Sequence, residues 1–261
     1  MEQPPPDRPP IDVGAVLFEA VDMIGSRPGS VFAIALVTTL PGRFAELAAA
    51  SYRPSTAEFA AIALFLAVTC LISLVAAVAG LFGEGALIGI VLAHHESAGR
   101  DFRKAMSAAL LKLPLFAMLG FIYLVSVIVG IALLIVPGII LACILSVIGP
   151  VTAAEKTGPL ATLRRSYELT SGTIWQIFVL LLVTQVGILL FLWASQHLLS
   201  LFMDGTLADP AYLLGPAPFL ILTAIHVVAM AFHLALICSL YVALLDRDGG
   251  QPATRLAEIF E

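Results

Sequence analysis

Charged residues are scarce in this sequence, and their scarcity excludes an ordinary water-soluble domain. Asp, Glu, Lys and Arg make up 12% of the 261 residues, whereas hydrophobic residues make up 60%. A soluble domain has about 25% charged and about 45–50% apolar residues. A soluble helical protein also interrupts its apolar residues with polar ones every three or four positions. This chain instead runs for long stretches without any charge, which is typical of a protein dissolved in lipid.

Cysteine and positively charged residues are also sparse. Cys70, Cys143 and Cys238 lie in apolar segments without the spacing of metal ligands, so we expect buried thiols, no disulfide and no metal. The net charge of −5 leaves no basic surface for nucleic acid. The sequence has no nucleophile elbow, phosphate-binding loop or dinucleotide fingerprint, and no paired carboxylates where a water-accessible site could form. We therefore expect no cofactor, no nucleic-acid partner and no enzymatic activity.

The charge-free stretches predict an all-α integral membrane protein. Crossing the hydrocarbon core takes about 20 helical residues. The stretch 113–154 is far longer than one span, so we expect it to turn back at Val136, Pro137 and Gly138. Six transmembrane helices are predicted, at residues 31–50, 59–81, 114–135, 139–154, 174–199 and 219–245.

These spans divide the chain into three parts. Residues 1–11 form a Pro-rich tail without the basic start and apolar run of a signal peptide, and we expect it to be disordered. Residues 12–248 form the six-helix transmembrane domain, and residues 249–261 form a short C-terminal tail.

The distribution of Lys and Arg predicts the orientation. With six spans, 11 of the 13 basic residues fall on the side that carries both termini, and Arg43 and Arg53 fall on the other. Positively charged loops stay in the cytoplasm. We therefore expect a multi-pass bacterial inner-membrane protein with cytoplasmic N- and C-termini. Trp175 and Trp193 are about 27 Å apart along the fifth span, which suits one aromatic residue at each membrane interface.

Amphipathic segments precede the first, third and fifth predicted spans. Their apolar residues recur at helical spacing over residues 13–24, 102–113 and 160–174. Each segment ends at a Pro or Gly before the chain enters the membrane. We expect two or three interfacial helices on the cytoplasmic side, and the pattern suggests a threefold repeat of one interfacial helix plus one transmembrane hairpin.

The segment 158–175, GPLATLRRSYELTSGTIW, is the most distinctive in the chain. Together with LIVPGIIL at 134–141, Glu155 between them and residues 241–247, it resembles the glycerophosphoryl diester phosphodiesterase membrane-domain family. The resemblance is strong over residues 130–180 and elsewhere concerns only the organisation of helices. It implies a stand-alone member without the catalytic barrel. Ser171 and Thr173 stand where the family often has basic residues.

Two interpretations of this segment remain open. Pro159 suits the first turn of a helix, Gly172 a helix end and Trp175 an interface anchor, so the segment can simply direct the next span into the membrane. Alternatively, Arg164 and Arg165 bind an anionic phospholipid headgroup or the acidic surface of a partner membrane protein.

Polar residues inside the predicted spans form a second candidate site. Glu84 lies between two glycines and can bind a proton or ion, or can reach the interface from a loosened helix end. His226 and His233 lie on one face of the last span and can hydrogen-bond to Thr184 or Gln185. His94 and His95 lack the second spaced histidine of a zinc motif, so we expect them to be solvated loop residues.

The sequence favours a non-catalytic membrane scaffold or regulatory subunit that engages lipids or another membrane protein. The alternative is a small transporter or channel with a polar path through Glu84, Gln185, His226 and His233. A membrane-embedded enzyme acting on lipid phosphodiesters is the third hypothesis.

Overall fold

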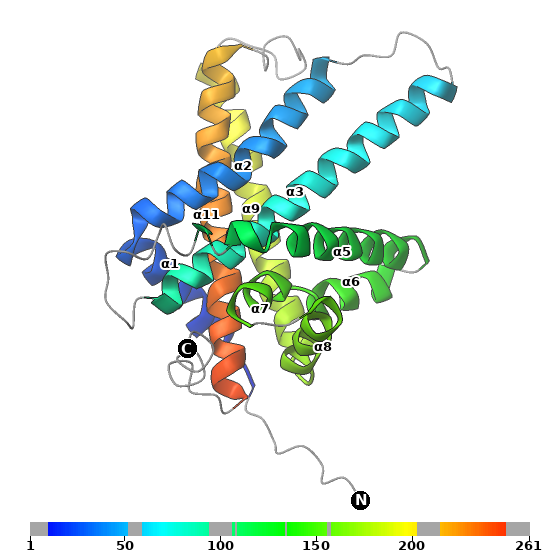
Figure 1. Cartoon of the computed structure of the whole chain (residues 1–261). Helices are drawn as coiled ribbons and strands as arrows, with labels where there is room; N and C mark the ends of the chain where they lie inside the picture. Colours follow the sequence, from blue (N-terminus) through cyan, green and yellow to red (C-terminus); the bar gives the residue numbers. More distant parts are fainter. Residues whose placement is uncertain are drawn as a thin grey trace, which may run out of the picture.

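A computed structural model describes residues 10–51, 59–93, 106–107, 109–133, 135–155, 158–202 and 215–248, and over these residues it is all-helical. Figure 1 shows long helices paired in hairpins, with shorter helices gathered at one end. The helices are α1 Val13–Ser26, α2 Pro28–Ser51, α3 Phe59–Ala93, α5 Leu113–Leu133, α6 Ile135–Ile144, α7 Ile148–Ala154, α8 Pro159–Thr170, α9 Ile174–Phe202 and α11 Pro216–Arg247.

Helix α11 is the centre of the bundle. Every residue from Leu234 to Tyr241 is buried, although a helix that packs on one side buries only a stripe of about every third or fourth residue. Helices α1, α2, α3, α7, α8 and α9 all contact it. By contrast, α9 exposes large apolar side chains along its length, including Leu190 and Trp193, so much of its surface is not covered by other helices.

The hairpin of α2 and α3 is longer than predicted. The prediction that the second span ends at Leu81 is wrong, because α3 continues to Ala93. Gly83 and Gly85 do not break this helix. A Cβ at Gly83 would lie 2.5 Å from Thr38 Cγ2, and one at Gly85 would lie 2.6 Å from Phe116 Cζ. The two glycines therefore allow α2 and α5 to approach α3 closely.

The chain reverses between α5 and α6, slightly before the predicted turn. Helix α5 ends at Leu133 and α6 begins at Ile135, so Pro137 lies in the first turn of α6, where its missing N–H costs no hydrogen bond. Gly130 faces Gly138 across the hairpin, and a Cβ on Gly130 would lie 2.7 Å from Gly138 Cα. In Figure 1 this hairpin runs across the long axis of α11 rather than along it.

The predicted span 139–154 lies within one apolar stretch long enough to cross a membrane, Ile135–Ala154, but a turn divides this stretch into two helices. Helix α6 ends at Ile144, a turn follows, and α7 begins at Ile148. All residues from Val147 to Thr152 are buried, so α7 is an internal helix packed against α3. The sequence conceals the break because the residues on both sides of it are equally apolar.

The junction of α8 and α9 agrees with the sequence prediction. Pro159 is in the first turn of α8, and Gly172 has φ +81°, a left-handed conformation that favours glycine. Helix α9 then begins at Ile174, as predicted. The first amphipathic segment is α1, whose start is capped by Asp12 through bonds from Gly14 N and Ala15 N.

Five of the described helical stretches are long and apolar enough to cross a membrane. A sixth span requires α1 and α2, which meet at a bend of 101°. The count of five to six long apolar helices is compatible with a multi-pass membrane protein. Part of the second amphipathic segment lies outside the described residues, as do His94, His95 and the predicted C-terminal tail 249–261. Of the predicted N-terminal tail 1–11, residues 1–9 lie outside the described residues, whereas Ile11 is buried in the core.

The contact between Gly130 and Gly138 predicts a large difference between two glycine substitutions. A methyl group in Gly138→Ala would meet the backbone of Ile131 at 2.7 Å, whereas one in Gly187→Ala meets nothing within 4 Å. Overpacking costs about 1–3 kcal/mol. We expect Gly138→Ala to lower the free energy of unfolding by that amount and Gly187→Ala to leave it unchanged or raise it, measured by reversible unfolding in mixed detergent micelles. Equal effects of the two changes would contradict the packing of the hairpin.

Candidate functional site

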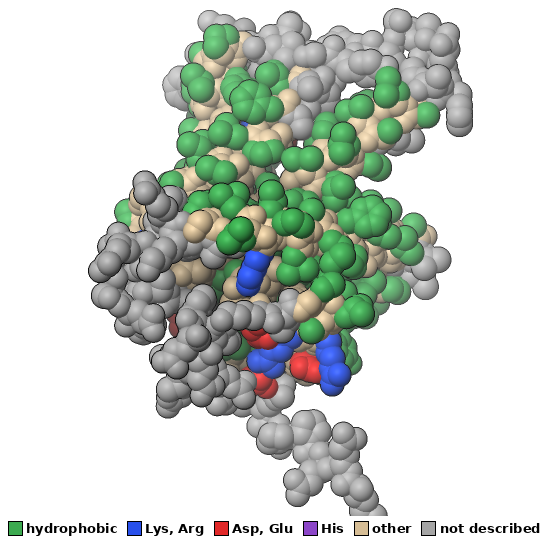
Figure 2. All heavy atoms as spheres, in the orientation of Figure 1, with side chains coloured by type: hydrophobic (Ala, Val, Ile, Leu, Met, Phe, Trp, Pro, Cys, Tyr) green, Lys and Arg blue, Asp and Glu red, His purple; other side chains and the backbone are tan. Residues whose placement is uncertain are grey.

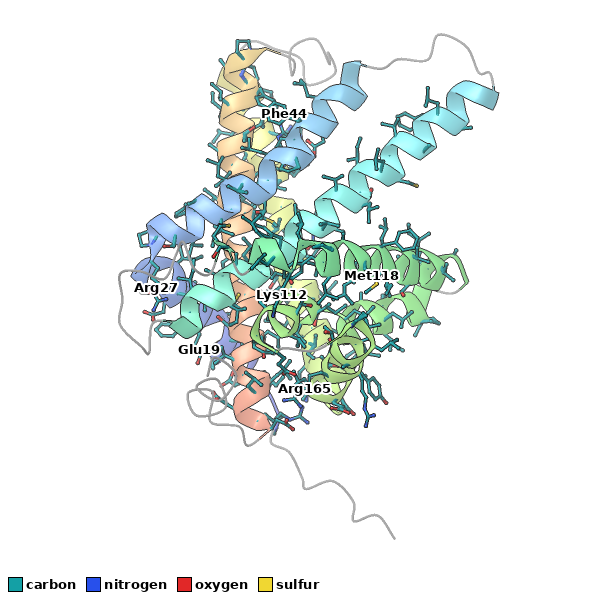
Figure 3. All side chains as sticks on the ribbon, in the orientation of Figure 1. Glu19, Arg27, Phe44, Lys112, Met118 and Arg165 are labelled. Carbon is teal, nitrogen blue, oxygen red and sulfur yellow. The ribbon has the colours of Figure 1, made fainter. Side chains whose placement is uncertain are left out.

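Side chains from other parts of the chain cap the ends of three helices. Lys112 Nζ donates to the carbonyls of Thr152 at 2.7 Å and Ala153 at 3.0 Å, and lies 3.4 Å from the Glu155 carbonyl. The last carbonyls of a helix lack partners within it and carry partial negative charge. Lys112 therefore supplies both the missing donors and the compensating charge at the end of α7 (Figure 3).

Carbonyl groups at the ends of α3 and α6 also accept hydrogen bonds from side chains distant in the sequence. Arg27 Nη1 donates to the Ile90 carbonyl near the end of α3 at 2.9 Å. Ser166 Oγ donates to the carbonyl of Ile144, the last residue of α6, at 2.6 Å. Arg27 before α2, Lys112 before α5 and Ser166 in α8 thus each bind the end of a helix that is distant in the sequence.

Arg165 is the hub of an ion-pair network. Its guanidinium donates to Glu155 Oε1 and to Asp248 Oδ2, both at 3.0 Å, and all three side chains are at most 20% exposed. Burial acts to lower the pKa of Arg165, but the hydrogen bonds and negative charges of Glu155 and Asp248 outweigh burial and raise this pKa. The network joins α8 to the residues that follow α7 and α11.

Arg247 joins the same end of α11 to the junction of α8 and α9. Its Nη1 donates to the Ser171 carbonyl at 3.3 Å and to Thr173 Oγ1 at 3.0 Å. A Cβ on Gly172 would lie 3.1 Å from Arg247 Nη2, so glycine also leaves room for this guanidinium. Figure 2 shows charged side chains gathered in this part of the molecule, below a mostly hydrophobic surface.

The two neighbouring arginines of α8 have different surroundings. Arg164 is 82% exposed and pairs with Glu168, one turn along the helix, at 2.8 Å. Trp175 is 71% exposed and its ring lies 5.2 Å from that of Phe178. Of the three residues predicted to bind a headgroup or partner, Arg164 and Trp175 are therefore on the outer surface, whereas Arg165 points into the ion-pair network (Figure 3).

Glu84 lies inside the bundle. The expectation that it reaches the interface from a helix end is wrong, because α3 continues for nine residues beyond it and the residue is only 6% exposed. Its Oε2 makes no hydrogen bond within the described structure. The carboxyl lies against Gly149 of α7, where any Cβ would overlap it, and the Cys238 thiol is 3.6 Å from the Glu84 backbone carbonyl.

The structure does not assemble the predicted polar path. Within the described ranges, no hydrogen bond joins any two of Glu84, Gln185, His226 and His233. Gln185 is exposed, and His226 Nδ1 donates to the Leu222 carbonyl of its own helix at 2.7 Å. The predicted bond from His226 to Thr184 or Gln185 is therefore wrong. His233 is half-buried.

The described surface contains recesses of different character. One of about 320 Å³ lies between α1 and the end of α11 and is lined by Asp12, Glu19, Asp246 and Arg247 among others. Another recess, of about 370 Å³, lies between α2, α3 and the start of α5. Its lining is almost wholly apolar and includes Pro41, Val75 and Phe82. No group of three or more His, Cys, Asp or Glu residues in the described part of the chain could hold a metal ion.

Comparisons with known proteins add no assignment to this geometry. No family model, no curated protein and no solved structure matches the chain. The resemblance to the glycerophosphoryl diester phosphodiesterase membrane-domain family stays a prediction.

Sequence reasoning missed the capping role of Lys112 and the pairing of Glu155 with Arg165. A signal for the first was present, because Lys112 and Glu155 flank the charge-free stretch 113–154. A stretch that crosses and returns brings its two ends together. The residues on either side of such a stretch are therefore candidates for mutual contact.

The different surroundings of Arg164 and Arg165 predict different effects on stability. Arg165→Ala leaves the carboxylates of Glu155 and Asp248 without their donor, and leaving a charged group unsatisfied costs about 1–3 kcal/mol or more. Arg164→Ala removes an exposed pair worth about 0.5 kcal/mol. We expect only the first change to lower the midpoint of unfolding in detergent clearly. An equal loss in both variants would contradict the network.

Proposed function

We propose that the chain is a six-span inner-membrane protein of a bacterium, with both termini in the cytoplasm and α1 and α8 at the cytoplasmic interface. The clustering of Arg27, Lys112, Arg165 and Arg247 at helix ends supports this orientation, because basic residues are retained on the cytoplasmic side. Helix α2, joined to α1 at the bend of 101°, supplies the remaining span.

The far half of α2 supports its assignment as a span. Arg43 pairs with Glu46, and its guanidinium lies 5.7 Å from the centre of the Phe219 ring at the start of α11. A cation that is both paired and placed over an aromatic ring suits the interfacial region. Phe44, 56% exposed, lies beside it on the outer surface (Figure 3).

The activity that we propose is non-catalytic: a membrane scaffold or regulatory subunit that engages anionic phospholipid or a partner membrane protein. The observation that carries this proposal is the exposure of Arg164 on α8 and of Trp175 at the start of α9, the helix that also exposes large apolar side chains along its length. A guanidinium and an indole at this depth suit a phosphate group and the headgroup region. Arg165 positions α8 from within.

As a family, we propose a stand-alone relative of the glycerophosphoryl diester phosphodiesterase membrane domains. The support is the sequence of residues 134–141 and 158–175, together with the helix start at Pro159 and the glycine turn at Gly172. The conformation of this junction suits a role in directing α9 into the membrane.

A second candidate function is ion-coupled transport. The observation that favours it is the unpaired carboxyl of Glu84 among the central helices, because ionisable residues within a bundle commonly mark ion pathways. The break between α6 and α7 is also typical of transporter helices. Reconstituted protein that moves an ion across liposomes, with loss of flux in Glu84→Gln, would support this function.

The lipid proposal can be tested with the two tryptophans of the chain. In a Trp193→Phe variant, Trp175 is the only tryptophan, and brominated lipids quench its fluorescence on contact. We expect brominated phosphatidylglycerol to quench it more strongly than brominated phosphatidylcholine, because Arg164 attracts the anionic headgroup. Adding Arg164→Ala should remove this preference.

The matched control is Trp175→Phe, in which Trp193 reports on the opposite end of α9 and should show no dependence on Arg164. Equal quenching of Trp175 by both lipids would contradict lipid recognition at this site.

The orientation is tested separately by tags at the two ends of the chain. We expect both an N-terminal and a C-terminal tag to be protected from protease in intact spheroplasts and to be digested in inverted vesicles. Tags found on opposite faces would contradict the even number of spans.

A further inference from the structure

Glu84 is the only carboxylate among the buried residues of the described structure, and no described group neutralises it. One of its oxygens has no hydrogen-bond partner. The nearby cations have other partners, since Lys112 binds the end of α7 and Arg27 binds the Ile90 carbonyl. Burial of an unpaired ionised carboxylate is very unfavourable. The packing around Glu84 is therefore compatible only with a carboxyl group that carries a bound cation.

The helices around Glu84 provide apolar groups and weak acids rather than positive charge. Thr38 of α2 uses its hydroxyl on the Ile34 and Ala35 carbonyls of its own helix. Helix α7 contains no titratable side chain. His233 of α11 makes no hydrogen bond to Glu84 in the described structure. Of the other titratable side chains on the surrounding helices, Tyr123 of α5 and Cys238 of α11 interact electrostatically with Glu84, and Cys143 of α6 and Tyr241 of α11 are buried.

A metal cation does not fit this environment. Sodium, calcium and magnesium ions require several oxygen ligands. Glu84 is the one carboxylate among the buried residues of the described structure, and its carboxyl lies against Gly149 of α7. No described cluster of three potential metal ligands includes it. A proton requires only the carboxyl oxygen itself.

We propose that Glu84 is a proton-binding site inside the membrane, and that its carboxyl holds the proton while α7 is packed against α3. The contact with Gly149 is so close that no side chain fits between the carboxyl and α7. Release of the proton leaves a carboxylate that needs water or a donor, which enters only when α7 moves away.

The connection before α7 permits such a movement. Residues 145–147 form a turn between α6 and α7, so α7 can shift while α6 remains in its hairpin with α5. The other end of α7 stays anchored by Lys112 and by the pair of Glu155 with Arg165. The structure thus combines a buried acid, a short helix that covers it, and a break at one end of that helix.

The first experiment measures reaction with dicyclohexylcarbodiimide, an apolar reagent for protonated carboxyl groups. The acid adds across one C=N bond of the reagent, its proton moves to nitrogen, and the O-acylisourea rearranges to a stable N-acylurea without a leaving group. The purified full-length protein in proteoliposomes is treated, digested and examined by mass spectrometry.

We expect one reagent mass on the peptide that contains Glu84, declining as the pH is raised, and no adduct there in Glu84→Gln. A water-soluble carbodiimide should label exposed Glu168 but not Glu84. Absence of the Glu84 adduct at every pH would overturn the proposal. Suppression of labelling by sodium ions at constant pH and ionic strength would also overturn it, in favour of a metal cation.

The second experiment follows the opening at Cys238, whose thiol lies beside Glu84. In a Cys70→Ala, Cys143→Ala background, Cys238 is the only thiol, and its reaction with a maleimide reports exposure. The reference is Glu84→Gln, which keeps the shape of the protonated acid. We expect the rate of maleimide reaction to rise between pH 6 and pH 9 by a factor at least tenfold larger with Glu84 than with Glu84→Gln (~10-fold corresponds to 1.4 kcal/mol).

The Glu84→Gln reference shows the pH dependence of the Cys238 thiol without a carboxylate beside it. A Glu84 carboxylate disfavours the thiolate by charge repulsion and slows the reaction, so a steeper rise in rate with Glu84 present reports exposure of the thiol and not its ionisation. An identical pH profile in the two proteins would overturn the coupling between the proton and α7. Both readouts are independent of lipid binding at Arg164 and of ion flux, so their failure is distinguishable from failure of either function proposed above.

Discussion

The structure depends on the need to satisfy helix ends that are buried against other helices. Carbonyl groups at the end of a helix have no partner within it, and in an apolar surrounding each unsatisfied group costs several kcal/mol. Lys112 meets this need for α7, Arg27 for α3 and Ser166 for α6. Because each donor lies far from its acceptor in the sequence, the same bonds that satisfy the backbone also set the relative positions of the helices.

These bonds explain how a short, internal helix is held in place. Seven residues are too few to form a stable helix alone. Helix α7 is stabilised by burial against α3, by Lys112 at its end and by the pair of Glu155 with Arg165 just beyond. Glu84 touches this helix from α3, which places the one buried acid of the described structure beside a short helix that is anchored at its C-terminal end and follows a turn at its start.

The two candidate sites differ in how far the sequence could predict them. Arg164, Arg165 and Glu84 were all identified from residue type and position. Which arginine faces outward was not predictable, because both follow a helix start by only a few residues and the partners of Arg165 lie 10 and 83 residues away. Glu84 was placed near the interface because flanking glycines suggested a helix end, whereas these glycines allow close contact with Thr38 and Phe116.

The sequence alone determined the helical class, the five to six long apolar helices and the starts of α8 and α9, because these follow from local properties: hydrophobic length, proline at a first turn and glycine at a helix end. Tertiary structure decided the continuation of α3 through Gly83 and Gly85, the break before α7, the central position of α11 and the partners of each buried charge. These features depend on which surfaces meet, and uniformly apolar segments contain no periodic pattern that distinguishes a surface facing lipid from one facing another helix.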